Sequence, residues 1–163
     1  MPRQLSVPAG VSACAVATTA KEAAFRIDYP LAAARNTRVV ALDADAESIV
    51  RAAAAEEWGQ ARFYSTTDPG HELVTMDGDA VDLAGELEDS NTVVMVSTNG
   101  QNAEAAATIG AACKVRGIMT AGLVVTPGQL TSEALVALRP HARILLVPAE
   151  PDDLTELLRA TRA

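Results

Sequence analysis

Aromatic residues, cysteines and long apolar runs are all scarce in this chain of 163 residues. Phe, Trp and Tyr make up only 3% of it, so the core has to be built from Ala, Val, Leu and Ile, with helices packed closely on a sheet. No run approaches the roughly 18 apolar residues of a membrane-spanning helix, and the N-terminus lacks the apolar stretch of a secretory signal. We therefore expect a soluble, cytoplasmic protein with one domain over residues 1–163.

Positive charge is also limited, because 13 Lys and Arg stand against 21 Asp and Glu, which gives a formal net charge of −8. Nucleic acids and anionic membranes both attract cationic surfaces, so neither is an expected partner. The two cysteines, Cys14 and Cys113, lie far apart and form no metal-ligand spacing. We expect buried, reduced thiols and no metal site.

Short apolar runs alternate with longer helical patterns along the whole chain. Strands are predicted at residues 4–7, 38–42, 61–65, 92–96, 117–125 and 143–147, with 72–76 as a short edge strand. Helices are predicted at residues 13–34, 46–57, 79–88, 103–116, 131–138 and 152–161. This alternation is typical of an α/β fold with three layers, a doubly wound and mostly parallel sheet that is Rossmann-like.

The loop at residues 97–102 is the sharpest candidate for a ligand site. Ligands of open α/β sheets bind beyond the carboxyl ends of the strands, where the strand order reverses. We expect strand 4–7 to lie beside strand 92–96 there, so that two helix N-termini with free N–H groups converge on an anion. The predicted ligand-binding residues are Gly10, Ser12, Ser97, Thr98, Asn99, Gly100, Gln101 and Asn102. The alternative is an ordinary capped turn between strand and helix.

The stretch VSTNGQNAEAAATIGAACKVRGIMTAGLVV resembles the signature of SIS (sugar isomerase) phosphosugar-binding domains. In that family an apolar strand ends in Ser-x-Ser-Gly-x-Ser/Thr and leads into a helix and a further strand. Ser97 matches the first serine, Gly100 the glycine and Glu104 an acidic residue of the helix, whereas Asn99 and Asn102 replace hydroxyl residues. The resemblance implies a small phosphorylated ligand.

The same stretch also resembles the nucleotide-binding half of tubulin-like GTPases. That family has a glycine-rich phosphate loop after its fourth strand, where this chain has Asn99-Gly100-Gln101-Asn102. Neither GxxxxGK[ST] nor GxGxxG occurs in the sequence. A nucleotide would therefore need side-chain contacts in place of the missing glycines.

Other polar residues have a structural and a functional interpretation. Asp43 follows a predicted strand, where it could bind a ribose or cap the next helix. His71 and His141 are typical loop histidines, and Cys14 a typical buried thiol in the first helix. His71 and Glu104 are candidates for an acid or base, but no catalytic residue and no cofactor is assigned.

Two functions remain open on the sequence. The first is a domain that binds a phosphorylated sugar or nucleotide at the strand-end crevice, with or without catalysis. The second is a non-catalytic module that forms a homo-oligomer or binds a partner protein. A titratable side chain within hydrogen-bond reach of a bound anion would distinguish the first from the second.

Overall fold

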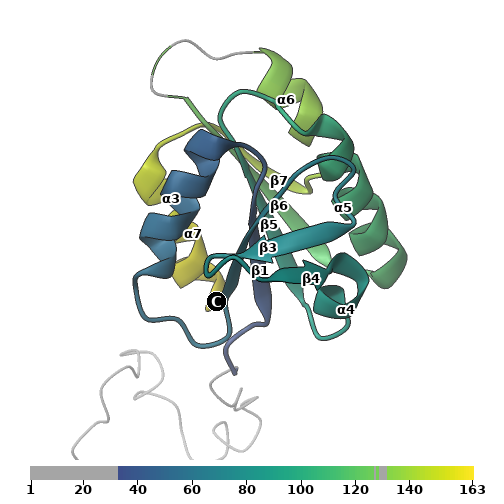
Figure 1. The fold of residues 1–163 in the computed structure, drawn as a ribbon. Helices are drawn as coiled ribbons and strands as arrows, with labels where there is room; N and C mark the ends of the chain where they lie inside the picture. The colour runs from purple at the N-terminus through teal and green to yellow at the C-terminus, as the bar shows by residue number, and fades with distance from the viewer. Residues whose placement is uncertain (1–32, 127, 129–131) are drawn as a thin grey trace, which may run out of the picture. The chain divides into compact units, whose positions relative to one another are not determined.

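Seven strands form one sheet, in the order β4-β3-β2-β1-β5-β6-β7 (Figure 1). The computed structural model describes residues 33–126, 128 and 132–163. The predicted strand 4–7, most of helix 13–34 and the residues Gly10, Ser12 and Cys14 lie outside the described residues. Ala33–Ala163 is one structural unit, and no helix in its described part is long and apolar enough to cross a membrane.

The parallel part of the sheet has the order of a doubly wound fold. The strands are β1 (Thr37–Ala41), β2 (Arg62–Thr66), β3 (Glu72–Thr75), β4 (Ala80–Asp82), β5 (Thr92–Ser97), β6 (Met119–Val125) and β7 (Ile144–Ala149). β3 pairs antiparallel with both β2 and β4, and the other neighbouring strands pair parallel. Counted in chain order, the five parallel strands follow the flavodoxin-like order 2-1-3-4-5. The expected fold class, a doubly wound and mostly parallel α/β sheet in three layers, is confirmed.

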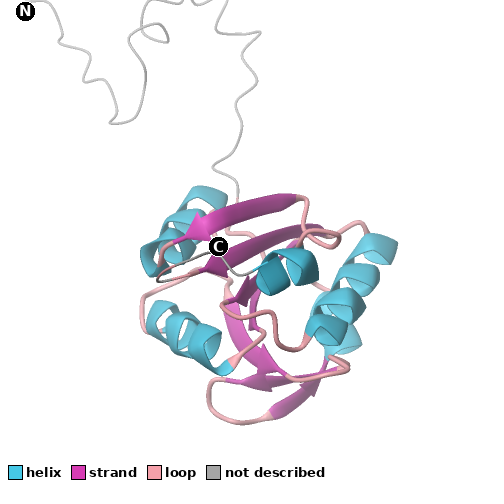
Figure 2. Ribbon diagram, turned by 90° about the horizontal axis from the view of Figure 1, so that it is seen from above, coloured by secondary structure: helices cyan, strands magenta, loops and turns pink. Residues whose placement is uncertain are grey.

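Helices cover both faces of the sheet, as Figures 1 and 2 show from two sides. The helices are α3 (Ala44–Ala54), α4 (Leu83–Leu87), α5 (Ala103–Arg116), α6 (Ser132–Leu138) and α7 (Pro151–Thr161). One apolar core lies between the sheet and α3 and α7, and a second lies under α4, α5 and α6. Successive side chains of β5 enter the two cores alternately, because side chains of a strand point to opposite faces.

Small apolar side chains fill these cores, as the scarcity of aromatics predicts. In α5 the buried residues are Ala105, Ala106, Ile109, Gly110 and Cys113. The Cys113 thiol is free, and burial raises its pKa to about 11. The expectation of a buried, reduced thiol is therefore confirmed for Cys113.

The prediction of a helix over residues 79–88 is wrong in its first part. Ala80–Asp82 forms β4, which pairs with β3 through Val81 opposite Leu73. The helix begins only after Asp82, whose carboxylate accepts a hydrogen bond from Gly85 N at 3.0 Å. Consequently β4, not the predicted strand 72–76, is the edge of the sheet. Strand pairing here overrides a locally helical composition.

Candidate functional site

The strand order reverses between β1 and β5, and the loops that follow these two strands face each other. β5 has β1 on one side and β6 on the other, with parallel register along both. Both neighbours of β5 are therefore strands of the described part of the chain, and the expected strand 4–7 lies outside that part. The loop that meets residues 97–102 begins at Asp43, directly after β1 and Leu42.

The carboxylate of Asp43 accepts the hydrogen bonds that this loop offers. Asp43 is only 6% exposed and caps α3 by accepting from Ala46 N at 2.8 Å, so its predicted capping role is confirmed. Thr98 donates twice, from its hydroxyl at 2.6 Å and from its backbone N at 2.7 Å. The Ser97 hydroxyl donates at 3.1 Å and Asn99 N at 3.4 Å. An internal anion thus occupies the donors that we expected to bind a ligand.

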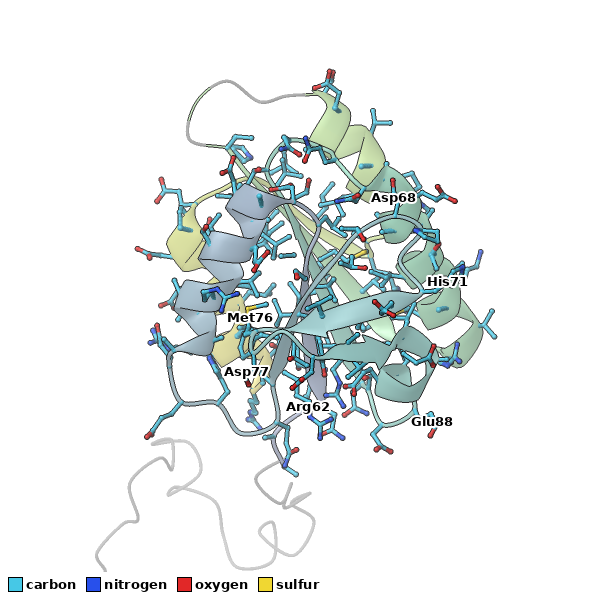
Figure 3. The ribbon with its side chains drawn as sticks, viewed as in Figure 1. Arg62, Asp68, His71, Met76, Asp77 and Glu88 are labelled. Atoms are coloured by element: carbon cyan, nitrogen blue, oxygen red, sulfur yellow. The ribbon has the colours of Figure 1, made fainter. Side chains whose placement is uncertain are left out.

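A second carboxylate occupies the N-terminus of α5. Asp68, which lies beside α5 in Figure 3, accepts from Ala105 N at 2.7 Å. The Asn102 side chain holds Asp68 in place by accepting from its backbone N at 3.1 Å, and donates to Leu42 O at 2.6 Å. Asn102 itself makes no side-chain cap and adopts a left-handed conformation with φ of 56°. Both anion-attracting groups of the crevice therefore bind the protein's own carboxylates.

Gly100 brings the loop close to a helix, where we expected it to approach a ligand. Its φ is +80°, and a Cβ at this position would lie 2.6 Å from the carbonyl carbon of Glu133 in α6. Gly100 N donates to the Ser97 hydroxyl at 3.1 Å, and Gln101 N donates to the Asn99 side-chain oxygen at 2.9 Å. Turn formation and packing against α6 thus account for these residues.

The cavity next to this loop is acidic. It has a volume of about 390 Å³ and is lined by Asp45, Ile49, Thr98, Val125, Thr126, Ala149, Glu150 and Pro151. The lining includes two carboxylates and no Lys, Arg or His. A phosphate group would meet negative charge at this position without a cation to compensate it.

The other candidate residues lie elsewhere. His71 lines a separate cavity with Asp82 and Thr108, and Figure 3 shows it beside α5. Glu104 is exposed in the first turn of α5. Neither histidine lines the cavity beside residues 97–102. Within the described ranges, no three His, Cys, Asp or Glu side chains are grouped to hold a metal ion.

Sequence reasoning missed the role of Asp68. The Asp68-Pro69-Gly70 segment predicted a turn, and its carboxylate caps a helix that begins 35 positions later, at Ala103. Gly70, with φ of +88°, makes this possible, because a Cβ there would lie 2.6 Å from Ala105 Cα. No local pattern marks such a contact between distant segments.

The largest of the described cavities lies at the opposite ends of the strands and is basic. It measures about 640 Å³ and lies between the end of α5, the start of β6 and the loop that leads into β7. Lys114, His141 and Arg143 contribute cationic or titratable side chains, and the largely buried Ile118 is an apolar part of the lining. We call this cavity the basic groove. Gly110 allows its walls to meet, since a Cβ there would lie 2.6 Å from His141 Cβ.

The charges around the basic groove are not neutralised by carboxylates of the described residues. Arg38, Arg51, Arg62 and Arg159 form ion pairs with Glu residues elsewhere in the fold. By contrast, four exposed cations form no ion pair with a described residue: Lys114, Arg116, Arg139 and Arg143. An acidic protein thus carries, around the basic groove, a group of exposed cations that form no ion pair with the described residues.

Comparison with known proteins gives a likeness of fold and no family. No family model matches the chain, and no curated protein matches it. A protein from Burkholderia pseudomallei described as pilus assembly-related is 19% identical over 83% of this chain and 95% of its own, with a TM-score of 0.45. A CheY-like response regulator receiver domain from Methanospirillum hungatei is 16% identical over 77% and 92%, with a TM-score of 0.37. Likenesses at this level carry no argument about function.

Proposed function

We propose that this domain is a non-catalytic interaction module, which docks an acidic protein surface in the basic groove. The observation that carries the proposal is the contrast between the carboxyl ends of the strands, where the crevice lies, and their amino ends, where the basic groove lies. At the strand-end crevice the hydrogen-bond donors already hold Asp43 and Asp68, whereas at the basic groove Lys114 and Arg143 have no partner among the described residues.

Binding of a phosphorylated sugar at residues 97–102, which the resemblance to SIS domains implies, would require a rearrangement. A phosphate could reach the Thr98 and Asn99 donors only after the Asp43 carboxylate has moved away, and it would then face Asp45 and Glu150. Moving a buried carboxylate away from five donors is costly, because each hydrogen bond to a charged group is worth about 1.5–3 kcal/mol. The interaction module needs no such change.

The basic groove has the composition of a protein interface. Cationic side chains at its rim surround the apolar Ile118, and rim charges of one sign select partners of the opposite sign. The dipole of α5 accounts for Lys114 and Arg116 in its last turn, but it does not require Arg139 and Arg143 on another segment. The net charge of −8 disfavours a nucleic acid as the partner.

An NMR titration of the full chain with a poly-glutamate peptide tests the proposal. At about 50 mM salt we expect shifts of the amide signals of residues 114–118 and 140–144, and at about 500 mM salt we expect these shifts to vanish by screening. Lys114→Glu/Arg143→Glu is expected to abolish them. Arg35→Glu/Arg162→Glu changes the net charge equally at two other exposed cations that form no ion pair with the described residues, and is expected to preserve the shifts. No perturbation of the groove, or equal loss in the control, would overturn the proposal.

A thermal-shift screen against sugar phosphates, nucleotides and inorganic phosphate tests the competing function. We expect no stabilisation that depends on Asn99, because its loop is already closed by Asp43. A bound ligand at about 100 times its dissociation constant would add about 2.7 kcal/mol, which raises the Tm by several degrees. Such a shift in the natural protein, lost in Asn99→Ala, would establish the phosphorylated ligand in place of the module.

A further inference from the structure

The edge of the sheet farthest from the basic groove carries a concentration of negative charge. Residues 72–89 contain seven Asp and Glu and no Lys or Arg. Asp77 and Asp79 are exposed in the turn between β3 and β4, and Asp82 is exposed at the end of β4. Figure 3 shows Asp77 and Glu88 projecting from this region. We call Asp77, Asp79 and Asp82 the acidic edge.

Resting on the function proposed above, we infer that the acidic surface bound in the basic groove is the acidic edge of a second copy of this chain. The groove is formed at the starts of β6 and β7, and β7 is one end strand of the sheet. The acidic edge belongs to β4, which is the other end strand. The two surfaces of one molecule therefore cannot meet, but those of two molecules can.

Contacts of this kind join copies head to tail. Each copy would use its groove toward one neighbour and its acidic edge toward another, which is a heterologous arrangement that closes into a ring or grows as a filament. Complementary charge fixes which surfaces meet, and like charges disfavour contacts of groove with groove or edge with edge. The same arrangement explains why neither the groove cations nor the acidic edge form ion pairs within the described part of one chain.

Two exposed apolar side chains directly follow cations of the groove in the sequence. Val115 is 86% exposed next to Lys114 in the sequence, and Ile144 is 42% exposed next to Arg143. These are two of the three large apolar side chains that the described residues leave exposed. Exposed ion pairs are individually weak, so we expect a weak and salt-sensitive association that these apolar contacts support.

Sedimentation velocity of the full chain provides the first test. At about 50 mM salt we expect the weight-average sedimentation coefficient to rise with protein concentration, and at about 500 mM salt we expect the monomer value throughout. A monomer at all concentrations in low salt would overturn the inference. The poly-glutamate titration would then show separately whether the groove binds other acidic surfaces, so the two proposals can fail independently.

Charge reversal on each surface provides the decisive test. Lys114→Glu/Arg143→Glu and Asp77→Lys/Asp79→Lys are each expected to abolish association alone. In a mixture of the two variants, the unchanged groove of the edge variant can bind the unchanged edge of the groove variant, and the reversed groove can bind the reversed edge. We therefore expect mixed assemblies. The control Arg35→Glu/Arg162→Glu is expected to associate like the natural protein. Equal loss in the control, or no assembly on mixing, would overturn the inference.

Discussion

At the scale of single residues, Asp43 links three parts of the fold. Its carboxylate caps α3 and accepts hydrogen bonds from Ser97, Thr98 and Asn99 at the end of β5. Because it is almost fully buried, its removal would leave several donors without a partner and without access to water. The residue thereby fixes the position of the loop that the sequence presents as a binding site.

Asp43→Ala is expected to lower the free energy of unfolding by about 2–4 kcal/mol, through loss of a helix cap and of charged hydrogen bonds. Urea unfolding of the natural protein and the variant measures the change. The matched control is Asp45→Ala, which removes an exposed carboxylate two positions later and should stay within about 0.5 kcal/mol. Equal effects of the two substitutions would show that the Asp43 hydrogen bonds contribute little.

Gly100 and Gly78 form a second matched pair. Both have positive φ, but a Cβ at Gly100 would clash with Glu133 of α6, whereas a Cβ at Gly78 would meet nothing within 4 Å. Gly78→Ala is expected to cost about 1–2 kcal/mol for its backbone conformation alone. Gly100→Ala is expected to cost about 1–3 kcal/mol more, because α6 must shift. If thermal unfolding shows the same loss of stability for both variants, the close packing of Gly100 on α6 does not contribute to the requirement for glycine.

At the scale of elements, Glu86 connects α4 to the sheet. Arg38 of β1 and Arg62 of β2 form ion pairs with its carboxylate, and the Tyr64 hydroxyl donates a hydrogen bond to it. Arg38 is 3% exposed, so its charge depends on this partner for compensation. Burial, followed by the hydrogen bond and charge of Glu86, raises the pKa of Tyr64 to about 12.

This raised pKa predicts a loss of stability at alkaline pH. Between pH 10 and pH 12 the unfolded chain has lost the Tyr64 proton while the folded protein retains it, so the free energy of unfolding falls as the pH rises. Below pH 10 the contribution is complete. Comparison with Tyr64→Phe isolates the effect, because all other groups titrate alike in both proteins. Parallel stability curves for the two proteins across this range would contradict the assignment.

The elements differ in how far their sequence predicts them. The Ala-rich segment Ala103–Arg116 is a helix with the predicted bounds, since its composition and the following Gly117, which ends it in a left-handed conformation, are local signals. Ala80–Asp82 is a strand against its local composition. It forms because Val81 pairs with Leu73 and packs on the core under α4 and α5, which a local pattern does not record.

At the scale of the whole molecule, stability is expected to be greatest in the middle of the sheet. All residues of β1 and β5 are buried, and each of these strands pairs with a strand on both sides. Hydrogen exchange followed by NMR should therefore give the slowest amides in β1 and β5 and faster exchange in the end strands β4 and β7. Protection of β7 equal to that of β5 would show that its outer edge is covered, as a stable assembly through that edge would require.

Charge is distributed unevenly over the same sheet. Negative charge gathers around β3 and β4 and unpaired positive charge around the basic groove, although the sequence gives only a net value of −8. Lys114 and Arg143 are 29 positions apart and meet at one cavity because α5 ends where β7 begins. Scattered single cations in the sequence thus become one surface feature in the fold.

The sequence by itself determined the fold class. Short apolar runs alternate with helical patterns, turn residues separate them, and each strand–helix unit repeats this local signal. The sequence also determined the small-residue core, whereas for Asp43 it left a helix cap and a ribose contact open. Tertiary structure alone decided which strand lies beside β5, and with it that carboxylates from two other loops close the crevice. That outcome depends on contacts between segments more than thirty residues apart, and such contacts leave no periodicity in the chain.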